Sequence, residues 1–193
     1  MPINYENTDI KGVSYNGTSI DKVIYNGTVV WESIQHKTGN LYYPTSNTSL
    51  NPNFTISDWS SGAFDGDGSD KAWKVFGSGY YAKQASVSGQ RCGAQILFNM
   101  QAEIYPIKIY FYGGNQDAGG GGGGGYQVVE ARRPDGSWYE LDRHEDVGGH
   151  TITMDGKTRI TGLRMGTVYG SGPKKWLEAN DCNVTEWNQK GTF

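Results

Sequence analysis

Three carboxylates lie close together in a glycine-rich stretch of the sequence, at Asp65, Asp67 and Asp70. Hard oxygen ligands carried on a flexible turn suit Ca²⁺. A solvated acidic turn that never meets a metal has the same residue pattern, because this spacing fits many turns. The stretch is therefore either a structural calcium site or an acidic turn.

The chain is also rich in side chains that bind sugars, with 13 tyrosines and 6 tryptophans. Aromatic rings stack on the C–H faces of a sugar, and planar polar groups reach its hydroxyls. Against this stands the interpretation that each aromatic residue belongs to the core. We expect the glycan-binding candidates to lie in loops, and they are Trp59, Tyr80, Tyr81, Arg91, Tyr126, His144, Tyr169 and Trp176.

Catalytic patterns are weak. The only histidines are His36, His144 and His150, and none stands in a recognisable nucleophile motif. The glycine run formally satisfies a dinucleotide-binding pattern, but the residues after it are strand-like, whereas that fold needs a helix there. We therefore expect no enzymatic activity.

Seven consecutive glycines, residues 119 to 125, lie between two segments of strand character. The run is either a flexible tether or a surface in which glycines make close backbone contacts with a partner. A hairpin needs few residues to turn, which favours a functional loop. The predicted recognition loop comprises Gly113, Gly114, Gly119, Gly120, Gly121, Gly122, Gly123, Gly124 and Gly125.

Composition excludes several classes of protein. The net charge of −3 provides no positive field for nucleic acid. No apolar run is long enough for membrane insertion, and the start of the chain lacks the pattern of a signal peptide. Cys92 and Cys182 form either one disulfide or two thiols, and the lack of an export signal favours two buried thiols.

The elements around these residues are expected to be strands. Short β-branched and aromatic segments alternate with turn signals along most of the chain, which indicates an all-β protein. The only doubtful segment is residues 173–180, where Pro173 at a first helical position would allow a single helical turn.

The N-terminal region carries a ten-residue repeat, with Asn16-Gly17 and Asn26-Gly27 each between alternating apolar residues. Asn-Gly favours the type I′ turn of a β-hairpin. Two such hairpins cannot bury their apolar faces alone, so we expect an attachment or oligomerisation element. Alternatively, the hairpins add strands to the following domain. The expected organisation is a hairpin region at 1–32, a linker and lead-in strand at 33–55, and a β-sandwich at 56–193.

The repeat resembles the N-terminal region of tail and other structural proteins of bacteriophages and prophages, over residues 3–32. This resemblance implies that residues 1–32 bind other virion proteins and that the protein is a homo-oligomer. It also implies synthesis in the cytoplasm of a host bacterium, followed by assembly into the virion.

A second resemblance covers about 130 residues and is carried by short motifs such as Ala63-Phe64-Asp65-Gly66-Asp67, Asp135-Gly136-Ser137-Trp138-Tyr139 and Arg159-Ile160-Thr161-Gly162-Leu163-Arg164. They are similar to the discoidin or coagulation-factor C-type domain. The resemblance implies a galactose-binding-like jelly-roll β-sandwich with a glycine-rich loop as an insertion. It also implies that Glu186 joins the three aspartates at the calcium site, whereas the two cysteines do not sit where that family bridges them.

Together these features predict a non-catalytic phage adhesin, a tail fibre or receptor-binding component that recognises a host cell-surface polysaccharide. The alternative is a structural virion protein of the baseplate, tail or head, whose sandwich mediates protein–protein contacts.

Overall fold

The computed structural model of the chain describes residues 13–20, 22–42, 52–60, 81–85, 91–117, 125–144, 148–169 and 175–192. All regular elements in these ranges are β-strands, so the all-β prediction is confirmed. Within the same ranges there is no helix of the length and apolarity needed to cross a membrane.

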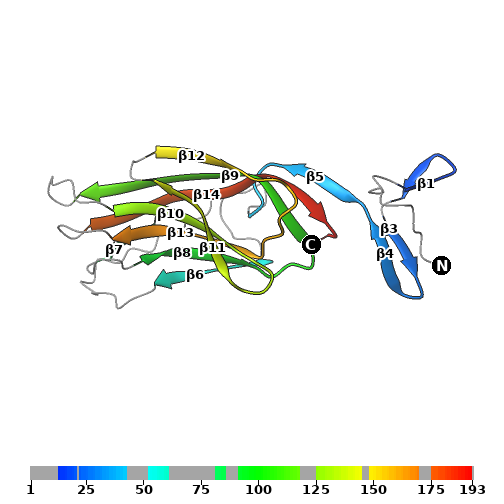
Figure 1. Ribbon diagram of the computed structural model, residues 1–193, viewed down its shortest axis with the longest axis horizontal. Coiled ribbons are helices and arrows are strands. Elements are labelled where there is room, and N and C mark those ends of the chain that lie inside the picture. The colour runs from blue at the N-terminus through cyan, green and yellow to red at the C-terminus, as the bar shows by residue number, and fades with distance from the viewer. Residues whose placement is uncertain are drawn as a thin grey trace.

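Two antiparallel sheets form the main body (Figure 1). Sheet 1 has the strand order β11 (Trp138–His144), β10 (Gly125–Arg132), β13 (Gly162–Tyr169), β8 (Arg91–Phe98) and β6 (Phe54–Ser60). Sheet 2 has the order β12 (Gly148–Thr153), β9 (Glu103–Asp117), β14 (Lys175–Lys190) and β5 (Ile34–Thr38), and β7 (Tyr81–Ala85) also pairs with β14. Their face-to-face packing is the predicted β-sandwich.

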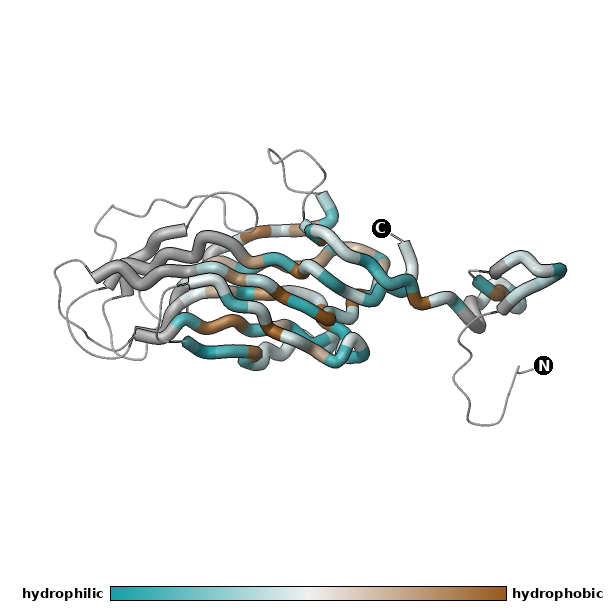
Figure 2. The backbone as a smooth tube through the Cα atoms, turned by 90° about the horizontal axis from the view of Figure 1, so that it is seen from above, coloured by the Kyte–Doolittle hydropathy of each residue, from teal (hydrophilic) through white to brown (hydrophobic). Residues whose placement is uncertain are grey.

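The core lies between the sheets and follows the period of two expected for strands with one buried face. Ile96 of β8 and Leu163 of β13 are fully buried from sheet 1, and Ile109 and Phe111 of β9 from sheet 2. Figure 2 shows hydrophobic and hydrophilic positions alternating along the strands. This alternation fixes which side chains of sheet 1 face solvent, and the candidate site is built from those.

The predicted N-terminal hairpins are present as two separate two-stranded sheets, β1 (Val13–Tyr15) with β2 (Thr18–Ile20) and β3 (Lys22–Tyr25) with β4 (Thr28–Glu32). Asn16 and Asn26 have φ of 50° and 48°, and the glycine after each has φ of 76°, as a type I′ turn requires. Among the described residues, neither hairpin pairs with a strand of the sandwich. Tyr15, Ile24 and Tyr25 are 71%, 59% and 57% exposed.

Two expectations about the chain path are corrected. Residues 33–55 were expected to be a linker with a lead-in strand, but β5 pairs with β14 from Glu186↔Thr38 to Lys190↔Ile34 and is an edge strand of sheet 2. Residues 175–180 do not form a helical turn, because they begin β14 and pair there with both β7 and β9. Pairing on both sides of the segment outweighs the weak helical signal of one proline.

Replacing Phe111 with Ala should destabilise the sandwich by about 3–5 kcal/mol, because it removes a fully buried ring and leaves a cavity. Tyr112 provides a matched control, since it is the next residue of β9 and is 38% exposed. Tyr112→Ala should change the free energy of unfolding by about 0.5 kcal/mol or less. Urea denaturation measures both, and equal losses would contradict the assigned faces of β9.

Candidate functional site

One end of the sandwich gathers most of the predicted sugar-binding residues. Strands β6, β9, β11 and β13 finish there, and β8, β10, β12 and β14 begin there. We call it the loop end; it lies away from the N-terminal hairpins (Figure 1). The register places Arg91 and Tyr126 on either side of Val168, and His144 beside Gln127.

The candidates were expected in loops, but the described ones are strand residues near the loop end. They are Trp59, Tyr81, Arg91, Tyr126, His144, Tyr169 and Trp176. Strand pairing extends further toward the loops than the turn signals indicated. Tyr80 lies outside the described residues, and for Tyr81, Tyr126, Tyr169 and Trp176 only the backbone is described, so their roles stay predictions.

Trp59 was predicted to bind a glycan, but its ring is covered. The residue is only 6% exposed, and the guanidinium of Arg164 lies 4.1 Å from the centroid of its ring. The same guanidinium lies 4.3 Å from the ring of Trp138. Arg164 is therefore held between an indole of β6 and an indole of β11 on the outer face of sheet 1, where cation–π attraction strengthens as water is excluded.

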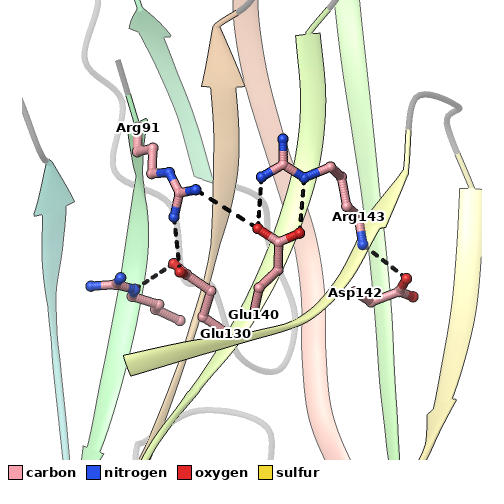
Figure 3. A network of polar contacts seen from close by, with 6 residues as sticks. Arg91, Glu130, Glu140, Asp142 and Arg143 are labelled. Carbon is pink, nitrogen blue, oxygen red and sulfur yellow. Dashed lines mark hydrogen bonds and ion pairs between the residues drawn. The ribbon is translucent and has the colours of Figure 1, made fainter. Parts of the chain in front are cut away.

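Glu130 is the centre of an ion-pair network on this face (Figure 3). Its side chain is 5% exposed and accepts hydrogen bonds from Arg91 Nη1 at 2.9 Å and from Arg164 Nε at 2.7 Å. A carboxylate buried to this degree needs such partners, since an unpaired buried charge is very unfavourable. The contacts join β10 to its neighbour β13 and to β8 beyond it.

A β-bulge creates the exposed part of the network. Glu130 is registered with Glu140 but Val129 with Asp142, so β11 has one extra residue at this point. Glu140 and Arg143 consequently face the same side although they are three residues apart. Arg143 donates from Nε and Nη2 to the two carboxylate oxygens of Glu140 at 2.9 and 2.7 Å.

Arg91 connects the buried and exposed parts. Its Nη1 binds Glu130, and its Nη2 lies 3.7 Å from Glu140 Oε2. The hydrogen bond from Arg143 lowers the pKa of Glu140, and the positive charges of Arg143 and Arg91 act in the same direction. Glu140 is therefore a carboxylate at neutral pH, with both of its oxygens able to accept hydrogen bonds.

The same bulge turns His144 toward the interior. Its ring stacks on His150 of β12 at a centroid distance of 3.7 Å, and Phe111 lies beside both rings. Asp142 Oδ2 lies 2.5 Å from His144 Nε2. His144 is thus part of a seam between the edge strands of the two sheets.

A buried amide lies at this end of the sandwich, and a buried cysteine lies near the middle of β14. Gln127, next to His144 in the register, is 3% exposed, and among the described residues neither its amide nitrogen nor its amide oxygen has a hydrogen-bond partner. Cys182 is buried opposite Phe111. The side chain of Cys92 is not described, so the predicted absence of a disulfide stays a prediction.

The predicted recognition loop is shorter than expected. Gly113 pairs with Gly148 and Ala179, and Gly114 pairs with Glu178, so both belong to β9. Gly125 begins β10 opposite Tyr169. These three glycines are strand residues because each pairs with a residue of a neighbouring strand. Gly119, Gly120, Gly121, Gly122, Gly123 and Gly124 lie outside the described residues.

The calcium site stays a prediction, since Asp65, Asp67 and Asp70 also lie outside the described residues. Glu186 is described, and its carboxylate already has two partners: Lys108 Nζ at 2.5 Å and His36 Nε2 at 3.5 Å. The hydrogen bond from Lys108 lowers the pKa of Glu186. Among the described residues, no group of three His, Cys, Asp or Glu is placed to hold a metal ion.

The sequence analysis missed the residues that organise the outer face, namely Glu130, Trp138 in its outward position, Glu140, Arg143 and Arg164. Alternation along VVEAR and GLRMG indicates that Glu130 and Arg164 face away from Val129 and Met165. The outward direction of these two side chains could therefore have been predicted from the sequence. The neighbourhood of β10 and β13, and the bulge in β11, are long-range features that no local pattern reveals.

Comparison with other proteins gives structural similarity only. No protein-family model matches the chain, and no curated protein matches its sequence. The structure is similar to the family 32 carbohydrate-binding module of NanJ from Clostridium perfringens, solved with galactose, at 15% identity over 68% of this chain and 93% of that one, with a TM-score of 0.40.

Two further modules from Clostridium perfringens are similar. One is CBM32-1 of a family 31 glycoside hydrolase, at 12% identity over 66% of this chain and 93% of that one, with a TM-score of 0.43. The other, CpGH89CBM32-5 with GalNAc-beta-1,3-galactose, is 13% identical over 80% of this chain and 94% of that one, with a TM-score of 0.36. These scores are too low to transfer a ligand, so the function must be inferred from the side chains described above.

Glu130→Gln should destabilise the protein by about 3–5 kcal/mol, because it leaves Arg91 and Arg164 without their buried carboxylate. Glu140→Gln is the matched control and should cost about 1 kcal/mol or less at neutral pH, since that carboxylate is 33% exposed.

The small contribution of Glu140 should depend on pH. Its pKa is lowered in the folded state, so its stabilisation is present above the pKa of the unfolded chain and is lost as pH falls through the folded value. Chemical denaturation of the wild type and both variants at pH 7 and in acid measures this. A Glu140→Gln loss as large as that of Glu130→Gln would contradict the assigned burial.

Proposed function

We propose that the protein is a non-catalytic adhesin that binds a glycan at the loop end of its sandwich. The observation that carries this proposal is that strands far apart in the sequence bring four of the predicted sugar-binding residues, Arg91, Tyr126, Tyr169 and Trp176, to that end. A jelly-roll sandwich provides rigid strands for such residues and leaves the connecting loops free to vary.

The described polar residues on the outer face of sheet 1, between the loop end and the β10–β11 turn, suit a polyhydroxylated ligand. Guanidinium and carboxylate groups lie side by side at Arg91, Glu140 and Arg143, each about one-third exposed. These groups donate to and accept from hydroxyls, whereas the overall charge of −3 gives no basis for binding nucleic acid.

We further propose that the adhesin is a virion component of a bacteriophage or prophage, attached through residues 1–32 and directed at a host cell-surface polysaccharide. The resemblance of residues 3–32 to phage structural proteins supports this, as does the exposure of Tyr15, Ile24 and Tyr25. Several copies held together would compensate for weak single sites, because avidity can exceed one site's affinity by about 10² or more.

The second candidate is a structural virion protein whose sandwich contacts other virion proteins. The exposed apolar residues of the hairpins support this candidate as much as the adhesin, because both would bind a protein partner through the hairpins.

A glycan array probed with the intact protein, together with binding to host cells before and after removal of their surface polysaccharide, tests the proposal. Saturable binding to a defined set of glycans is expected. Binding to host cells that survives removal of the polysaccharide, with no glycan bound on the array, would favour the structural alternative.

Replacing Gly119 to Gly125 with seven serines tests the predicted recognition loop. If the glycines make close backbone contacts with the target, added side chains should weaken binding by about tenfold while the melting temperature stays almost unchanged. Glycan binding measured by surface plasmon resonance, beside thermal denaturation, gives the answer. Full binding by the serine variant would identify the run as a tether.

Deleting residues 1–32 should leave a folded monomer. The deletion removes both hairpins but keeps β5, which begins at Ile34 and pairs with β14. Light scattering should show an oligomer for the full chain and a single copy for the shortened one. The same number of copies in both would contradict a role of the hairpins in assembly.

A further inference from the structure

We propose that the exposed part of the ion-pair network, Arg91, Glu140 and Arg143 on the outer face of sheet 1, is a recognition platform for a neutral saccharide. This inference rests on the proposed glycan-binding function and specifies where and how part of the ligand is bound. It places the contact on strand residues of the outer face of sheet 1, between the loop end and the β10–β11 turn.

The platform is rigid before any ligand arrives. Arg91 is fixed from below by the buried carboxylate of Glu130, which Arg164 holds from the other side. Arg164 is in turn clamped between Trp59 and Trp138. Polar groups held by such a supporting shell lose little side-chain entropy when a ligand binds.

The exposed groups match the hydrogen-bonding needs of adjacent sugar hydroxyls. Each hydroxyl both donates and accepts. Glu140 offers two carboxylate oxygens, and Arg91 and Arg143 bring N–H groups to the same place, with Arg91 Nη2 3.7 Å and Arg143 Nη2 2.7 Å from Glu140 Oε2. A pair of neighbouring hydroxyls can therefore donate to Glu140 while accepting from a guanidinium.

The position of Glu140 favours a neutral ligand over an acidic one. Its carboxylate lies between the two exposed guanidinium groups, with Arg143 Nη2 at 2.7 Å and Arg91 Nη2 at 3.7 Å from Oε2 (Figure 3). An acidic sugar would have to compete with Glu140 for the guanidinium groups and would meet its negative charge. A neutral sugar meets no such repulsion.

A contribution to stability does not explain why Glu140 and Arg143 are paired on the exposed face. An ion pair at this degree of exposure contributes about 1 kcal/mol or less. The bulge that brings Glu140 and Arg143 together interrupts the ladder between β10 and β11. Bulges commonly aim side chains at functional sites.

The test compares three variants on immobilised neutral oligosaccharides and on acidic relatives with the same backbone, each carrying one uronic or sialic acid. Arg143→Ala and Glu140→Gln remove one side of the platform each and should weaken binding to neutral glycans at least tenfold. Arg133→Ala is the matched control, since Arg133 is an exposed arginine of the β10–β11 turn whose guanidinium lies over Tyr139, and Tyr139 packs on the core side of sheet 1. It should bind like the wild type.

Thermal denaturation of each variant shows that a loss of binding is not a loss of folding. If both Arg143→Ala and Glu140→Gln bind glycans as tightly as the wild type, the inferred platform is wrong. The proposed glycan-binding function would still stand. A preference of the wild type for the acidic relatives would overturn the inferred ligand class. Absence of any glycan binding by the wild type would overturn the proposed function and, with it, this inference.

Discussion

The antiparallel pairing of β9 with β14 is the interaction on which the sandwich depends. It runs from Glu103↔Lys190 to Asp117↔Lys175 and spans the full length of sheet 2. β12 adds to one side of this pair, and β5 and β7 add to the other, one after the other along β14. The strand β14 therefore carries β9 along its full length on one side and both β5 and β7 on the other.

The outer face of sheet 1 depends on a different constraint, the burial of one carboxylate. Glu130 is acceptable there only because Arg91 and Arg164 neutralise it, and Arg164 is placed by two tryptophans. The neighbouring bulge then directs Glu140 and Arg143 outward and His144 inward. Because of one extra residue in β11, Glu140 and Arg143 face solvent while His144 faces the interior and stacks on His150.

Local signals in the sequence were sufficient for the fold class and for the hairpins. The two Asn-Gly pairs require positive φ at both residues, and both turns have it. Local signals failed where the decision is made by distant partners. Gly113 and Gly114 resemble loop residues in isolation, but they have strand partners, and residues 175–180 extend β14 despite the proline just before them.

The candidate site was predicted by residue type more successfully than by environment. Arg91 and His144 were singled out, and both belong to polar clusters at the loop end. Trp59 was also singled out, yet it is buried beneath a guanidinium, because a large ring on a sheet face can be covered by a long side chain from another strand, here β13 with β8 between. Glu130 escaped notice because burial of a glutamate is rare and only its partners make it possible.

The arrangement of the chain separates attachment from recognition. The hairpins with their exposed Tyr15, Ile24 and Tyr25 lie at one end of the molecule, and the loop end lies at the other (Figure 1). A partner bound to the hairpins would therefore leave the loop end and the neighbouring outer face of sheet 1 uncovered. Copies that assemble through their hairpins would present several such surfaces together. Avidity requires this geometry, because linked sites add affinity only when they can bind at the same time.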